Sequence, residues 1–166
     1  MLRSLASACG SLVLFLAVPA CAQAVAHVEP FELKGPRPLD EQTRAAVVRD
    51  YLDAWRSMSA ALGGNRADRI DAAFVGDAKD KLNGTILQQT MLRVSTNYHD
   101  QSHDLRIVFY SPDGLSIEMT DDSEYELQVF DQGRPVATQQ IRAHYIVVLT
   151  PAETRWKVRV LQAAAE

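Results

Sequence analysis

Between residues 105 and 160, apolar and polar side chains alternate in short runs that are separated by turn residues. Such a period of two places all the apolar side chains of an extended strand on one face. Ser-Pro-Asp-Gly at 111–114 and Asp-Gln-Gly at 131–133 are short turn sequences, which join strands that run in opposite directions. The pattern predicts an antiparallel meander with one buried face.

A period of three to four residues precedes the strands. Apolar side chains from Val48 to Leu62 form one helical stripe, with Asp40 as the expected N-cap and Gly63-Gly64 at the C-terminal end. Asn65 is expected to cap a short second helix, and Asp77 a third. We therefore expect an α+β domain whose N-terminal helices cover one side of the antiparallel sheet.

The first 24 residues are typical of an export signal. Arg3 precedes an apolar run from Leu12 to Val18, and small residues suited to cleavage follow, ending at Ala24. Residues 25–39 contain three prolines, which predicts an extended linker to a single domain at 40–163. The expected location is the bacterial periplasm, and no membrane-spanning stretch is expected beyond residue 24.

Cys21 leaves an alternative open. The segment that ends in Cys21 resembles a bacterial lipoprotein box, although Pro19 departs from that pattern, and lipidation would anchor the chain to the envelope. Cleavage after Ala24 would instead leave a chain without cysteine, stabilised by its core alone. The net charge of −4 disfavours nucleic-acid binding, because phosphate backbones attract basic surfaces.

Three segments resemble the nuclear transport factor 2-like (cystatin-like cone) superfamily. They are YLDAW at 51–55, AHYIVVL at 143–149 and RWKV at 155–158. Within that superfamily the chain is similar to the intermembrane-space domains of plastid-division proteins, which are considered non-catalytic interaction modules. The resemblance implies helices packed on a strongly curved, cone-shaped antiparallel sheet. It does not select a function, because this fold hosts both enzymes and scaffolds.

The inward face of the cone is predicted to be almost wholly apolar, and only Asp121 and Ser123 are polar residues in the inward phase. An enzyme of the isomerase or dehydratase type would use Asp121 as a base and Tyr51 or Tyr145 as a hydrogen-bond donor. The alternative, which we favour, makes 121–123 a solvated bend turned outward by a bulge. An apolar pocket would be lined by the aromatic residues Tyr51, Trp55, Tyr125, Tyr145 and Trp156.

Two further groups of polar residues are candidates for binding. His99 and His103 with neighbouring aspartates offer zinc ligands, but on a strand they would lie about 13 Å apart, so we expect polar surface there. Arg142, His144, Lys157 and Arg159 are expected on the outer face of the sheet, as an anion-binding patch or as ordinary solvated charges.

The sequence thus favours an exported, non-catalytic binding or scaffolding domain that contacts an unidentified protein and needs no cofactor. The alternatives are a cone that binds a small apolar ligand and, less favoured, an enzyme centred on Asp121. A homodimer that buries the outer face of the sheet is compatible with the first reading.

The mature N-terminus tests the export hypothesis. Intact-mass measurement of the exported protein from its own host should give a chain that begins at Val25. A chain that begins at a lipidated Cys21 would establish the lipoprotein alternative, and an uncleaved chain would contradict both.

Overall fold

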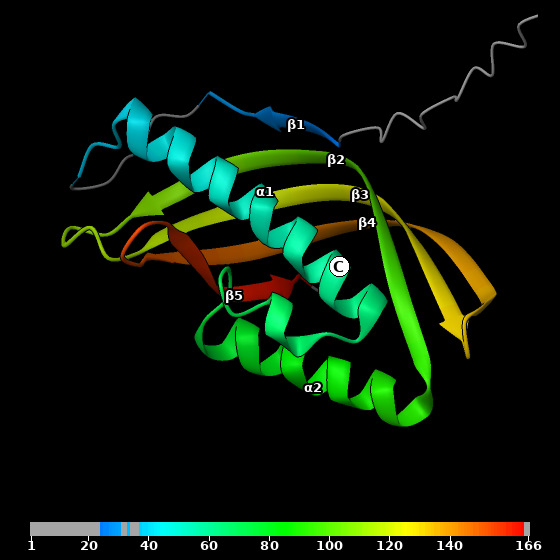
Figure 1. Ribbon diagram of the computed structural model, residues 1–166. Coiled ribbons are helices and arrows are strands. Elements are labelled where there is room, and N and C mark those ends of the chain that lie inside the picture. Colours follow the sequence, from blue (N-terminus) through cyan, green and yellow to red (C-terminus); the bar gives the residue numbers. More distant parts are fainter. Residues whose placement is uncertain (1–23, 31–32, 34–36, 165–166) are drawn as a thin grey trace, which may run out of the picture.

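The computed structural model of the chain describes residues 24–30, 33 and 37–164. A five-stranded sheet in the order β1-β2-β3-β4-β5 curves around two helices, and the helices lie on its concave side (Figure 1). The elements are β1 (Val25–Val28), α1 (Glu41–Gly64), the 3₁₀ turn η1 (Ala67–Arg69), α2 (Gly76–Leu92), β2 (Val94–Tyr110), β3 (Ile117–Asp131), β4 (Arg134–Pro151) and β5 (Trp156–Ala163). This confirms the expected α+β class with an antiparallel meander, since β2 to β5 pair antiparallel in chain order.

The first helix begins where the sequence predicts. Asp40 accepts a hydrogen bond from the backbone N–H of Thr43 at 2.8 Å, which satisfies one of the unpaired donors of the first turn. At the other end Asn65, not a glycine, takes the left-handed conformation with φ of 50° and caps α1. The expectation that Asn65 begins the next helix is therefore wrong. Gly63 lies inside α1, and a Cβ there would stand 2.4 Å from Oδ1 of Asn97.

The segment between the helices is a single 3₁₀ turn rather than a short α-helix. The last residues of this segment hydrogen-bond to β5. Val75 N–H donates to the carbonyl of Val158, and Val158 N–H donates to the carbonyl of Ala73, both at 2.9 Å. This pairing holds Phe74 in a bridge to Val158 and keeps Val75 extended. Consequently α2 starts at Gly76, after Val75, and the prediction of Asp77 as its N-cap is wrong.

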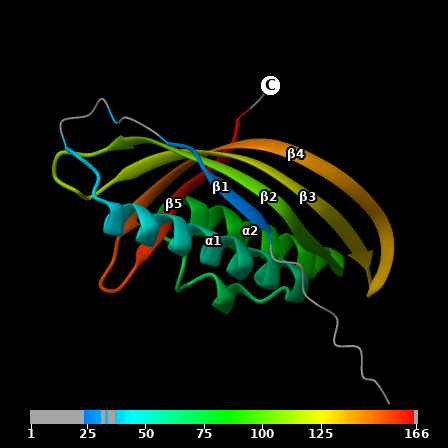
Figure 2. The same ribbon diagram turned by 90° about the horizontal axis from the view of Figure 1, so that it is seen from above.

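The segment expected to be only a linker contributes a strand. Val25–Val28 pairs in parallel with Ser102–Leu105 at the edge of β2. The four residues carry no run of alternating apolar side chains long enough to indicate a strand, so only the tertiary pairing defines it. β1 runs alongside α1 (Figure 2), and this matters for the groove described below.

Two bulges in β2 change which side chains face inward. The pairing with β3 shifts between Asp100 and Ser102 and again between Ile107 and Phe109. After the second shift Phe109 is 40% exposed and Tyr110 is buried, the reverse of what unbroken alternation from Leu105 predicts. A bulge adds one residue to a strand and thereby reverses the phase that alternation predicts.

Asp50 fixes α1 to the last strand. Its side chain is buried, and Oδ2 accepts a hydrogen bond from the backbone N–H of Trp156 at 2.8 Å, while Arg49 donates to Oδ1. The sequence placed Asp50 off the apolar stripe, but the contact with β5 explains its burial. A buried carboxylate with these partners holds the start of β5 in place.

Replacing Asp50 should therefore destabilise the fold. Asp50→Ala leaves the Trp156 N–H without its acceptor and should lower the free energy of unfolding by about 2 kcal/mol in urea melts. Asp53→Ala is the matched control on the same helix, because that side chain forms only partly exposed ion pairs with Arg56 and Arg155. Its loss should cost about 0.5 kcal/mol. Equal losses in the two variants would contradict the anchoring role of Asp50.

Candidate functional site

A buried polar cluster lies at the centre of the sheet's concave face. Asp121 on β3 is fully buried, and its Oδ2 accepts a hydrogen bond from the hydroxyl of Tyr51 on α1 at 2.6 Å. Nδ1 of His103 on β2 lies 2.8 Å from the same oxygen. Three elements therefore converge on one carboxylate oxygen. The expectation that residues 121–123 form a solvated bend is wrong, because Asp121 and Ser123 are both buried within a regular stretch of β3.

The first bulge of β2 brings a second carboxylate to the same histidine. In a regular strand, residues three apart point to opposite faces. The shift between Asp100 and Ser102 places both Asp100 and His103 on the concave side, with Asp100 Oδ2 3.9 Å from Nε2 of His103. His99 is exposed. The structure therefore separates His99 from His103, and the expectation of polar surface at 99–104 is wrong for His103, which is 1% exposed.

Aromatic rings fill the space beside this cluster. The indole of Trp55 lies 5.1 Å from the His103 ring, 5.7 Å from Tyr125 and 5.5 Å from Tyr145, centroid to centroid. The hydroxyls of Tyr125 and Tyr145 are 2.9 Å apart and share a hydrogen bond. Four of the five aromatic residues expected to line a pocket thus pack in one region, against one another and the polar cluster. The fifth, Trp156, packs against Tyr110 instead.

The environment changes the proton affinities of the cluster. Burial, together with the negative charge of Asp121, raises the pKa of Tyr51 well above its ordinary value, so the hydroxyl keeps its proton. For His103, burial lowers the pKa, but the nearby carboxylate of Asp100 and the hydrogen-bonded carboxylate of Asp121 outweigh burial and raise the pKa from 6.5 to about 9. At neutral pH His103 is therefore a cation held between two carboxylates.

Some polar atoms of the cluster have no partner. Among the described residues, Nε2 of His103, Oδ1 of Asp121, Oδ1 of Asp100 and Nε1 of Trp55 are buried without a hydrogen bond. Oδ2 of Asp121 already accepts two hydrogen bonds, and none of the three joined side chains is more than 1% exposed. A substrate therefore has no direct access to the carboxylate that the enzymatic hypothesis requires as a base.

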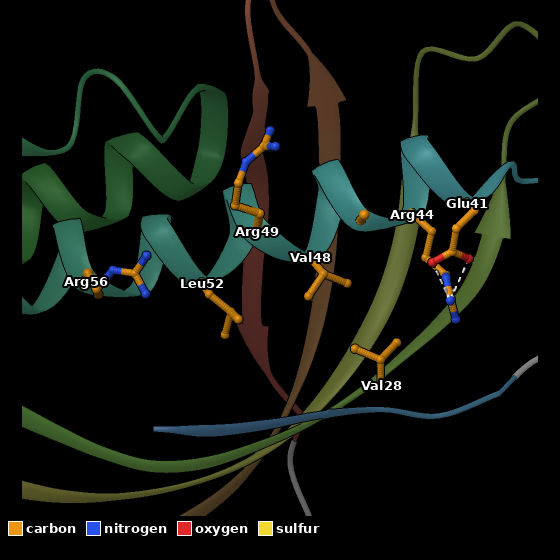
Figure 3. A pocket seen from close by; sticks show the side chains of 8 residues that line it. Val28, Glu41, Arg44, Val48, Arg49, Leu52 and Arg56 are labelled. Carbon is orange, nitrogen blue, oxygen red and sulfur yellow. Dashed lines mark hydrogen bonds and ion pairs between the residues drawn. The ribbon is translucent and has the colours of Figure 1, made fainter. Parts of the chain in front are cut away.

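A groove runs between α1 and β1, outside the core (Figure 3). Val48 and Leu52 project from α1 toward β1, and Val28 projects back toward the helix, so the floor is apolar. The volume is about 500 Å³. Its remaining lining is charged, and consists of Glu41, Arg44, Arg49 and Arg56 apart from the small Ala45.

The groove continues along α1 into a second hollow. Leu52 and Arg56 line both spaces, and the second, of about 850 Å³, extends past Ser59 to Tyr98, Asp100 and His103 on β2. One side of α1 is thus bordered by a continuous depression. No sequence signal indicated this site, because it depends on β1 lying beside α1.

The four residues of the expected outer-face patch do not gather into one cationic surface. Arg142 pairs with Glu124 at 2.9 Å, and Nδ1 of His144 lies 2.7 Å from Oδ1 of Asp122. Lys157 donates to the backbone carbonyl of Asp71, and the side chain of Arg159 lies over Gly76 at the start of α2. Charges of opposite sign therefore alternate on this face.

The raised pKa of His103 gives stability a defined pH dependence. Because the folded-state pKa of about 9 exceeds 6.5, protonation favours the folded chain. This contribution is complete below pH 6.5 and is lost as the pH rises through 9. The free energy of unfolding should fall by about 3 kcal/mol over that window relative to His103→Gln. His144→Gln is the control, and an identical pH profile for wild type and His103→Gln would refute the assignment.

Comparison with solved structures identifies the fold. No protein-family model and no curated protein matches the chain. The crystal structure of the intermembrane space region of chloroplast protein ARC6 matches with a TM-score of 0.62 at 15% identity, covering 78% of this chain and 100% of that one. A putative scytalone dehydratase from Novosphingobium aromaticivorans matches with a TM-score of 0.50 at 14% identity, covering 76% of this chain and 89% of that one.

These similarities, at low identity, concern the fold alone. Helices packed on a curved, mostly antiparallel sheet are the shared architecture. One of the two matched structures is named as an enzyme and the other as a region of a chloroplast protein, so the fold does not choose between catalysis and binding. The chain has the nuclear transport factor 2-like fold, which it shares with the ARC6 intermembrane-space region.

Proposed function

We propose that the chain is an exported, non-catalytic binding domain whose receptor site is the groove between α1 and β1. The observation that carries the proposal is the composition of this groove, an apolar floor beneath a rim that bears three guanidinium groups and one carboxylate. Concave apolar sites with a few charged groups are typical of ligand and partner recognition.

The rim defines the chemistry of the partner. Arg44 pairs with Glu41, Arg49 with Asp50 and Arg56 with Asp53, yet each guanidinium has five N–H groups and can bind a further carboxylate. The preferred occupant is a protein segment with apolar side chains for the floor and acidic residues beside them. Aspartate and glutamate suit the rim because arginine binds carboxylates in a bidentate manner.

The interior supports a structural rather than a catalytic role for the polar cluster. An isomerase or dehydratase centred on Asp121 would need an accessible carboxylate, with Tyr51 or Tyr145 free to donate to the substrate. Here Tyr51 donates to Asp121 itself, and Tyr145 is bonded to Tyr125. This enzymatic alternative predicts turnover that Asp121→Asn abolishes, whereas the binding proposal predicts only a loss of stability.

A small apolar ligand remains the second candidate. Because the rings of Trp55, Tyr125 and Tyr145 pack against one another inside the cone, such a molecule would bind in the groove rather than in the cone interior. A lipid or other apolar compound that copurifies with the wild type and is lost with groove variants would favour this candidate over a protein partner.

Export is part of the proposal and rests mainly on the first 23 residues, which lie outside the described part of the chain. The likeness to a region from an intermembrane space is compatible with a role outside the cytoplasm. Within the described residues, no helix has the length and apolarity needed to cross a membrane. The homodimer through the outer face of the sheet stays a prediction, which analytical ultracentrifugation can test.

Changing the groove should abolish partner binding without unfolding the domain. Leu52→Glu places a carboxylate on the apolar floor, and Arg56→Glu reverses a charge on the rim. Photo-crosslinking at Leu52 in the host would identify the partner segment. The corresponding synthetic peptide should then bind each variant at least tenfold more weakly in calorimetry, because each change removes a contact or adds repulsion.

Leu87→Glu is the matched control. Leu87 is a 63% exposed leucine on α2, remote from the groove, so this variant should bind the peptide like the wild type. Melting temperatures of all the variants separate lost binding from lost folding. Wild-type affinity in both groove variants would contradict the proposed site.

A further inference from the structure

One half of β4 has an open edge. β5 pairs with β4 only from Tyr145 to Pro151, and the carbonyl of His144 accepts a hydrogen bond from Ala164 N–H, so residues 134–143 of β4 bond to β3 on one side and to no strand on the other. Within the described part of the chain this is a free edge with one bulge, at Val136, and it extends beyond the helices as the outermost arm of the sheet (Figure 2). Side chains 134–140 are all exposed.

The backbone of this edge is oriented for pairing. The carbonyl of His144 accepts a hydrogen bond from Ala164 N–H at 2.8 Å, on the side of β4 where β5 lies. In an antiparallel strand the N–H and C=O groups of one residue point to the same side, and this side alternates along the strand. Arg142, Gln140 and Thr138 therefore direct their N–H and C=O groups to the open side.

Native proteins usually protect such edges with charges, prolines or a covering segment. Between Pro135 and Ile141 the sequence Pro-Val-Ala-Thr-Gln-Gln-Ile has no charged residue, and its proline stands at the start. Val136 is 60% exposed. Alternating N–H and C=O groups along an extended edge are matched only by another extended polypeptide, so the missing neighbour is a strand.

We propose that this edge pairs antiparallel with the same edge of a second copy of the chain, about a two-fold axis at Gln139. This alignment pairs residues 137–141 of the two copies, the regular and uncharged part of the open edge that follows the bulge at Val136. The inference is independent of the groove and its partner, since the groove lies beside β1 at the opposite edge of the sheet.

Self-pairing fits the side chains. About Gln139, Thr138 faces Gln140 of the second copy, and Ala137 faces Ile141. Beyond this stretch, Arg142 lies opposite the bulge at Val136 of the second copy. Two arginines never oppose each other in this register, and like charges directly opposite would weaken a sheet. Two five-stranded sheets become one continuous sheet, which removes both open edges.

Proline at an outward-pointing position tests the interface. Thr138→Pro removes an N–H that faces the open side and that the pairing with β3 does not use, so the protomer should keep its fold. In sedimentation velocity the wild type should be a dimer at micromolar concentration, and Thr138→Pro should raise the dissociation constant at least tenfold. Thr138→Val, which keeps the N–H, should remain a dimer, and circular dichroism checks that all three proteins are folded.

A cysteine on the axis tests the register. The backbone groups of Gln139 point to β3, so Gln139 would face its own copy as a non-hydrogen-bonded pair with a Cα separation of about 4.5 Å, within disulfide range. In protein that begins at Val25, which contains no other cysteine, Gln139→Cys should form a disulfide-linked dimer under mild oxidation. Gln162→Cys on β5 should not. A monomeric wild type at 100 µM, or a dimer unaffected by Thr138→Pro and not linked through Gln139→Cys, would overturn the proposal.

Discussion

The carboxylate of Asp121 is the interaction on which the rest of the structure depends. One oxygen of a fully buried side chain receives the hydroxyl of Tyr51 and lies within hydrogen-bond distance of the His103 ring, so α1, β2 and β3 meet at one point. Burying a charge is costly unless it is paired and hydrogen-bonded, and here a histidine held as a cation supplies the pairing. Once formed, the cluster sets the position of α1 across the concave face of the sheet.

The position of α1 in turn creates the groove beside β1. Because the inner face of the helix is fixed by Tyr51 and Trp55, its neighbouring face presents Val48 and Leu52 toward β1. The chemistry of the molecule is thereby divided between two places. Tyr51, His103 and Asp121 form a buried polar cluster that holds three elements together, whereas the accessible apolar surface lies in the groove, beneath arginines that can bind carboxylates. This division supports binding rather than catalysis.

Local patterns predicted the elements well. The sequence predicted the apolar stripe of α1, its Asp40 cap and the alternation of β3 and β4, because each of these depends on neighbours in sequence. Three features depend on tertiary contacts and could not be predicted: β1, which exists only by pairing with β2, the burial of Asp50 against β5, and the bulge that brings Asp100 to His103. One signal was available, since His103 precedes buried Leu105 by two residues and shares its inward phase.

The most direct test of the central claim is the protonation state of His103, measured by ¹⁵N NMR of the imidazole rings from pH 6 to 10. A structural cation between the carboxylates of Asp100 and Asp121 should show both ring nitrogens protonated at pH 7, a titration midpoint near 9 and slow exchange of the Nδ1 proton with water. A neutral ring at pH 7 that titrates near 6.5, with fast exchange, would mean that the cluster is open to solvent. The division between a closed interior and an external binding groove would then be wrong.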